Sequence, residues 1–252
     1  MKRKRISVIL FTVVAIAAVT AAGIFQGLGQ KRRDTNIEER ADKVQEGQMT
    51  EKQRVHSKLF KHSGAKLSDI AARQNGDVEV EEGLGLITVL PVAGSHQPVF
   101  HSAVCNADAV IIGILNDKAS QLTDEGSFVF TDYQIIVQEV IKNNPVAPLQ
   151  ASGVITGTRD GGVIELNHRI FRAKREDFDP PVVGQRYLLF LRFIPATGAY
   201  LMYGNGTFQL DGQGILALGP AARAELEKNS TKDSAGFLSQ IRVFANTDCQ
   251  RQ

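Results

Sequence analysis

Alternating apolar and polar residues predict short β-strands along most of the chain from residue 78 onward. In the expected long strand at 127–143, Tyr133, Ile135 and Val137 share one face, whereas Val140 has the opposite parity, so a mid-strand bulge is predicted. Further strands are expected at 77–82, 85–92, 108–116 and within 185–218, a hairpin at 153–166 with its tip at 160–162, and turns at 195–198, 204–206 and 211–212. Buried positions should include Val110, Ile112, Ile135, Val137, Leu188 and Phe190.

Helical patterns flank these strands. One or two turns are expected at 98–107, and two amphipathic helices at 220–229 and 234–244. About six strands with short connections and terminal helices favour a mainly β fold over a parallel α/β sheet. The sequence therefore predicts a small OB-like barrel with flanking helices over residues 76–252, and it places 100–216 in the barrel itself.

The N-terminal segment, residues 1–25, is expected to be a signal anchor. Four basic residues, Lys2 to Arg5, precede 20 uncharged residues at 6–25, a helix of roughly 30 Å that matches a bilayer core. Because positive flanks stay in the cytoplasm, the rest of the chain would lie outside it, in the periplasm or at the cell surface. One alternative is a cleavable signal peptide ending at Ala21 or Ala22, which would make the protein secreted; another is a buried helix of a soluble protein.

Residues 26–75 are rich in charge and lack an apolar stripe, which is typical of a solvated stalk that is partly helical. The alternative at 66–74 is a short amphipathic helix that packs on the domain through Leu67, Ile70 and Ala71. The whole chain carries a net charge of +2. Without the four N-terminal positives, 25 basic side chains face 27 acidic ones, so no nucleic-acid partner is expected.

Three motifs carry a resemblance to a known family: CNADAVIIGIL at 105–115, a Y-x-I-x-V-x-x-V-I-K strand at 133–142, and GQRYLLFL at 184–191 after a Gly-Gly turn. In this order they resemble tissue inhibitors of metalloproteinases and other netrin-type modules, and extracytoplasmic bacterial proteins of unknown role. The resemblance implies an OB-type barrel. In those inhibitors the equivalent cysteine is N-terminal and its amine chelates zinc. The nitrogen of Cys105 is an amide, so that mechanism is not expected unless the chain is cut just before it.

The chain contains two cysteines, Cys105 before the first barrel strand and Cys249 near the C-terminus. An oxidising compartment outside the cytoplasm favours a disulfide between them. The alternatives are a free or intermolecular cysteine and a catalytic thiol. A catalytic thiol needs a base, and no histidine stands in a recognisable motif near either cysteine.

One basic segment is a candidate binding site. Residues 168–177 combine basic side chains with an aromatic one, which favours an anionic glycan or a lipid head group; the alternative is a charged strand edge that discourages aggregation. The candidate residues are Arg169, Phe171, Arg172, Lys174 and Arg175. No metal-ligand spacing, phosphate-binding loop or nucleophile–base pair is recognisable, so no catalytic residue, metal or cofactor is expected.

These observations favour a non-enzymatic, membrane-anchored extracytoplasmic module that binds an unknown protein partner. Envelope polysaccharide is the alternative ligand, since OB barrels also hold oligosaccharides. A hydrolase is least expected. Exposed aromatic side chains on one barrel face would favour a glycan, and an apolar patch would favour a protein.

The predicted disulfide can be tested on the purified chain. Non-reduced mass spectrometry should show Cys105 linked to Cys249, and reduction should lower the melting temperature. The closed loop is long, so the chain-entropy model gives a stabilisation on the order of 5 kcal/mol. Cys105→Ser should have the same effect as reduction. Two free thiols after purification under oxidising conditions would exclude the bond.

Overall fold

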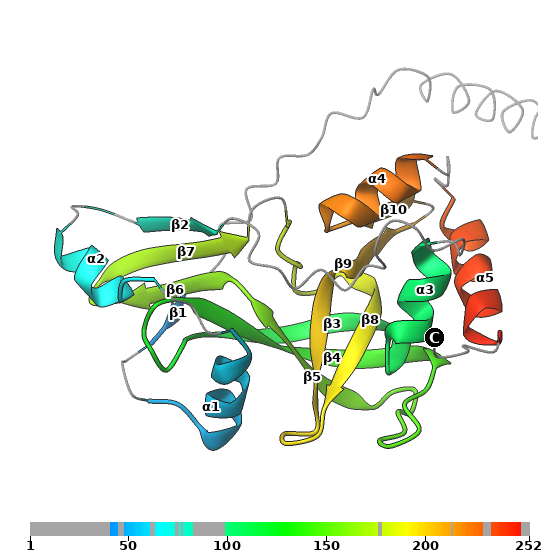
Figure 1. Cartoon of the computed structure of the whole chain (residues 1–252), viewed down its shortest axis with the longest axis horizontal. Helices are drawn as coiled ribbons and strands as arrows, with labels where there is room; N and C mark the ends of the chain where they lie inside the picture. Colours follow the sequence, from blue (N-terminus) through cyan, green and yellow to red (C-terminus); the bar gives the residue numbers. More distant parts are fainter. Residues whose placement is uncertain are drawn as a thin grey trace, which may run out of the picture. The chain divides into compact units, whose positions relative to one another are not determined.

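A computed structural model of the chain describes residues 41–44, 48–60, 64–73, 76, 78–82, 99–175, 178–212, 214–228 and 233–247 (Figure 1). All of them belong to one compact unit, Arg40–Gln252; the other unit is Met1–Glu39. Among the described helices, none is long and apolar enough to cross a membrane. The predicted anchor, residues 6–25, and the strand expected at 85–92 lie outside the described residues.

The chain is mainly β, as predicted, and five of its strands close a ring (Figure 1). The six-stranded sheet has the order β10-β9-β5-β4-β3-β8, and β8 also pairs with β9, which closes it. The pairing of β5 with β9 is parallel and the others are antiparallel. The strands are β3 (Ala109–Leu122), β4 (Val129–Lys142), β5 (Val154–Asp160), β8 (Arg186–Ile194), β9 (Ala199–Asp211) and β10 (Gly214–Ala217).

The long strand β4 contains the predicted bulge. Val137 pairs with Gly113 and Glu139 with Ile112, so Gln138 between them has no partner residue on β3. The extra residue reverses the parity of β4, which lets Val137 and Val140 contribute to the same apolar cluster. This cluster fills the inside of the ring with residues of all five strands, including Ile111, Ile135, Leu189, Tyr200 and Met202.

Three helices cover the outer face of β3, β8 and β9: α3 (Val99–Asn106), α4 (Pro220–Lys228) and α5 (Ser234–Ala245) (Figure 1). The ring of Phe100 on α3 lies 5.1 Å from that of Phe237 on α5, both within the apolar cluster under the helices. Arg242 of α5 donates two hydrogen bonds, of 2.8 and 3.0 Å, to Glu139 of β4. These hydrogen bonds from Arg242 lower the pKa of Glu139.

A second sheet of four strands has the order β1-β6-β7-β2. Its core contains Val78, Ile164 and Phe171, together with Leu67 of α2 (Leu67–Arg73). Residues of the expected stalk therefore supply parts of the same compact unit. The strands are β1 (Asp42–Lys43), β2 (Val78–Glu82), β6 (Gly162–Leu166) and β7 (Arg169–Arg175).

Two expected turns were wrong. The predicted hairpin at 153–166 does not form, because β5 pairs with β4 and β9 whereas β6 pairs with β7 and β1. Gly161 and Gly162, both with positive φ, carry the chain from one sheet to the other. The hairpin tip lies instead between β6 and β7 at Asn167 and His168, also with positive φ. The expected turn at 204–206 is part of β9.

Gly157 of β5 tests how tightly the inside of the ring is packed. A Cβ atom there would lie 2.6 Å from Ile135 Cδ1 and 2.7 Å from Met202 Sδ. Gly157→Val should therefore lower the free energy of unfolding by about 1–3 kcal/mol, measured by urea titration. Gly214→Ala is the control: its nearest atom is Asp211 O at 3.5 Å, so a change within about 0.5 kcal/mol is expected. Equal effects would show that the ring interior is not close-packed.

Candidate binding pocket beside strand β9

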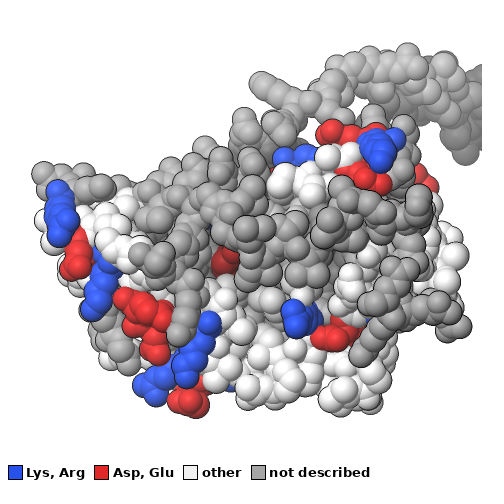
Figure 2. Space-filling model, in the orientation of Figure 1, with Lys and Arg blue, Asp and Glu red and all other residues white. Residues whose placement is uncertain are grey.

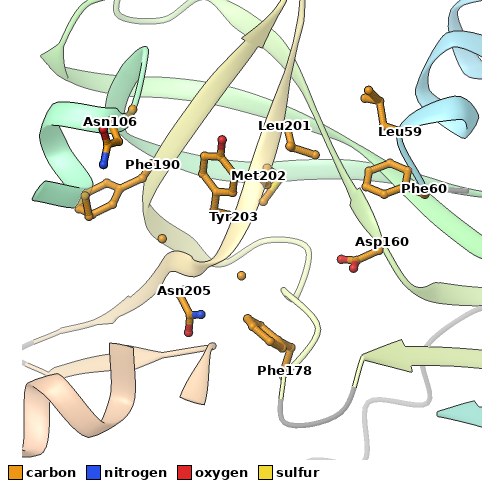
Figure 3. A pocket seen from close by; sticks show the side chains of 14 residues that line it. Leu59, Phe60, Asn106, Asp160, Phe178, Phe190, Leu201, Met202, Tyr203 and Asn205 are labelled. Carbon is orange, nitrogen blue, oxygen red and sulfur yellow. The ribbon is translucent and has the colours of Figure 1, made fainter. Parts of the chain in front are cut away.

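A pocket opens on the outer face of β9, between α3 and the turn η1 (Lys58–Phe60) (Figure 3). The space inside it, counted out to its open mouth and including open solvent, is about 800 Å³. Leu59 and Phe60 form one side, Phe190 and Asn106 the opposite side, and Leu201 and Tyr203 lie between them (Figure 3). The lining is mostly aromatic and aliphatic, and Asn106, Asp160 and Asn205 add polar groups.

A large bulge in β9 forms the floor of this pocket. Leu189 pairs with Thr207 and Leu191 with Met202, so the four residues 203–206 oppose the single residue Phe190. The side-chain oxygen of Asn205 accepts from the first N–H groups of α4, at 3.1 Å from Ala221 N. The side chain of Asn205 thus connects the bulge to the N-terminus of α4.

Glycines in the bulge permit close packing. A Cβ atom on Gly204 would overlap the ring of Phe178, and one on Gly206 would lie 2.8 Å from Phe190 Cβ. The GNG motif therefore serves close approach of aromatic rings to the backbone, whereas the sequence predicted a turn.

The turn η1, which follows the short helix α1 (Glu51–Ser57), forms the side of the pocket that contains Phe60. Thr50 and Gln53 make a capping box: Gln53 N donates to Thr50 Oγ1 at 3.3 Å, and Thr50 N donates to Gln53 Oε1 at 2.8 Å. This segment belongs to the region in which the sequence predicted a solvated stalk. The segment contacts the ring largely through polar side chains, and it therefore lacks the apolar stripe by which a docking helix is recognised in a sequence.

His56 is the centre of that docking. Its side chain is fully buried and joins β4 to the β8–β9 turn. Nδ1 lies 2.8 Å from Asp132 Oδ1, and Nε2 lies 2.9 Å from Thr197 Oγ1. A carboxylate only accepts, so Nδ1 donates to Asp132, and in the neutral ring Nε2 accepts from the Thr197 hydroxyl.

Two further contacts fix the same segment. The backbone N–H of Asp124, in the β3–β4 loop, donates to Ser57 Oγ at 2.7 Å. The ring of Phe60 stacks on that of Phe130 of β4, with centroids 5.9 Å apart. The segment thus contacts the β3–β4 loop, strand β4 and the β8–β9 turn.

The Thr197–His56–Asp132 series has the order of a hydroxyl–imidazole–carboxylate triad, which the search of the sequence for nucleophile–base pairs missed. Its surroundings favour a structural role. The backbone N–H groups of Thr197 and Gly198 both donate to Ile194 O, at 3.1 and 3.0 Å, so neither is available to stabilise an oxyanion. His56 has no exposed surface from which to reach a substrate. Asp132 and Thr197 lie 76 and 141 residues from His56 along the chain, so no local sequence motif indicates these contacts.

The predicted basic face differs from expectation. Phe171 is fully buried in the core of the second sheet, so it cannot contact a ligand beside the basic residues. Strand β7 is not an edge, because β2 pairs with it in parallel. The register places acidic residues of β2 beside basic ones of β7: Glu79 beside Arg172, Glu81 beside Lys174, and Glu82 beside Arg175. Arg169, the remaining candidate, pairs with Leu166 of β6.

Cys105 lies half-buried on α3 and is not a free cysteine. Cys249 lies outside the described residues, so the bond between them stays a prediction. The docking of α5 agrees with that prediction, since Phe237, Leu238 and Ile241 are buried as expected. One histidine near Cys105 was missed: His101 Nε2 lies 4.0 Å from its sulfur, one helical turn away. The i,i+4 spacing on the predicted helix was the available signal.

Among the described residues, no group of three or more histidine, cysteine, aspartate or glutamate side chains is arranged to hold a metal ion. Comparisons with models of protein families and with curated proteins found no match to this chain.

Replacing His56 tests whether it holds the segment on the ring. His56→Ala removes hydrogen bonds to a carboxylate and a hydroxyl, so docking should weaken by about 2 kcal/mol or more. Amide hydrogen exchange of residues 53–58 should then accelerate roughly 30-fold, whereas amides of β3 and β4 keep their protection. His56→Asn, which can still donate to Asp132, should give an intermediate rate. Unchanged exchange at 53–58 would show that His56 does not hold the helix.

Proposed function

We propose that the chain is a non-enzymatic, membrane-anchored extracytoplasmic module that binds a protein partner through an OB-type barrel. Numbered along the chain, the five ring strands close in the order first, second, third, fifth, fourth, with the third and fifth parallel. This arrangement supports the barrel, as does the motif resemblance to netrin-type modules. OB barrels bind ligands on the face of their second and third strands, which here are β4 and β5.

The observation that carries the proposal is the pocket beside β9. Its aromatic and aliphatic lining suits an apolar side chain of a partner, and Asn106, Asp160 and Asn205 are polar residues among those that line it. This pocket is sufficient to hold one anchor residue of a partner.

A protein partner is favoured over a glycan or a nucleic acid. The exposed large hydrophobic side chains of the described residues are all leucine or valine, so outside the pocket they offer no aromatic platform for stacking. On the face shown in Figure 2, the described basic and acidic side chains are interspersed, without the single-sign field that a polyanion requires.

Site-specific photo-crosslinking in the full chain tests the proposal. A benzophenone amino acid in place of Tyr203, which lines the pocket, should capture a defined envelope protein. The same group in place of Val243, which is 60% exposed on α5, is the matched control and should capture none of it. Leu201→Asp should abolish the product at 203, because a carboxylate cannot enter an apolar site without cost. Equal products at both positions would contradict the proposal.

A further inference from the structure

Part of the outer face of β4 is covered by a piece of the same chain. Residues Thr50–Phe60 contact the β3–β4 loop at Asp124, strand β4 at Phe130 and Asp132, and the β8–β9 turn at Thr197. In an OB-type barrel these are the first loop, the second strand and the loop between the fourth and fifth strands, the elements that hold ligands.

The covering segment is bound like a ligand. Helix α1 has only seven residues, and a helix of this length is not stable alone, so its conformation depends on docking. Two side chains four residues apart make the main contacts: His56 donates to Asp132, and Phe60 stacks on Phe130. The fully buried imidazole replaces the apolar stripe by which helices normally pack.

The fit leaves one hydroxyl unsatisfied. Thr158 of β5 is fully buried, and its Oγ1 has no hydrogen-bond partner. Thr158 pairs with Asp132 on one side and with Leu201, which lines the pocket, on the other. Neighbours in register point to the same face of a sheet, so this hydroxyl lies in the row that joins the His56 contact to the pocket. Buried polar groups are normally satisfied, and a ligand with a matching group would gain here.

We propose that the outer face of β4 and β5 is a peptide-binding groove and that Thr50–Phe60 is its intramolecular ligand, which a partner segment displaces. This inference rests on the proposed binding function and names its ligand class: a helical protein segment that presents a hydrogen-bond donor and an aromatic ring four residues apart. Displacement removes Leu59 and Phe60 from the pocket, so groove and pocket become one continuous surface.

Supplying the segment in trans tests the groove without a known partner. A fluorescent peptide of residues 48–60, QMTEKQRVHSKLF, is titrated with the full chain carrying His56→Ala and Phe60→Ala, and its anisotropy is followed. The peptide should bind this variant. Its affinity for the unaltered chain should be lower by a factor of roughly ten or more, because the tethered copy competes at an effective concentration near millimolar.

Matched controls distinguish specific binding of the peptide from nonspecific adhesion to the protein. A peptide with alanine in place of its histidine should not bind, and Asp132→Ala added to the double variant should abolish binding of the normal peptide. Circular dichroism checks that each variant keeps its strands, and Phe60→Ala alone serves if the double variant does not fold.

Binding of the peptide to neither chain, or to both equally, overturns the groove. A peptide that binds as expected while position 203 captures no protein upholds the groove and contradicts only the proposed function at the pocket.

Discussion

The pairing of β8 with both β3 and β9 is the constraint on which the rest of the structure depends. It closes five strands into a ring and so gives every strand an inner and an outer face. The inner face is fully used by an apolar cluster packed closely enough to require Gly157. Any additional element or ligand must therefore bind the outer face.

The outer face is divided between two kinds of contact. Over β3, β8 and β9, helices α3, α4 and α5 bury apolar side chains such as Phe100 and Phe237, which is the ordinary hydrophobic drive of a core. Over β4, the segment Thr50–Phe60 is held chiefly by His56 and one aromatic stack. The hydrogen bonds of His56 make this contact specific. Because few apolar side chains take part, the segment is more easily replaced by another than a core element would be.

Sequence patterns predicted what depends on local periodicity. The strands at 108–116 and 127–143, the bulge after Val137 and the docking face of α5 all follow from where apolar residues recur. All six residues predicted to be buried are buried, yet Val110, Ile112, Leu188 and Phe190 lie under the helices whereas Ile135 and Val137 lie inside the ring. A period of two identifies buried faces without saying what covers them.

What could not be predicted depends on distant partners or on the backbone. The GNG motif has the composition of a turn, but its glycines admit Phe178 and Phe190 to the strand. His56 stands in a charged segment without an apolar stripe, and its partners follow 76 and 141 residues later. Phe171 alternates with Arg172 and Lys174, so in a strand it lies on the opposite face from them, and the second sheet shows that this face is buried.

The segment Thr50–Phe60 lies on the outer face of β4 in the free chain. Nuclear Overhauser contacts between the ring protons of Phe60 and Phe130, measured in the full chain with isotope-labelled phenylalanine, test it most directly. The account predicts these contacts in the free chain, where the centroids lie 5.9 Å apart, and their loss when an unlabelled peptide of residues 48–60 is added in large excess. Contacts that are absent from the free chain, or that persist while the peptide is bound, would contradict it.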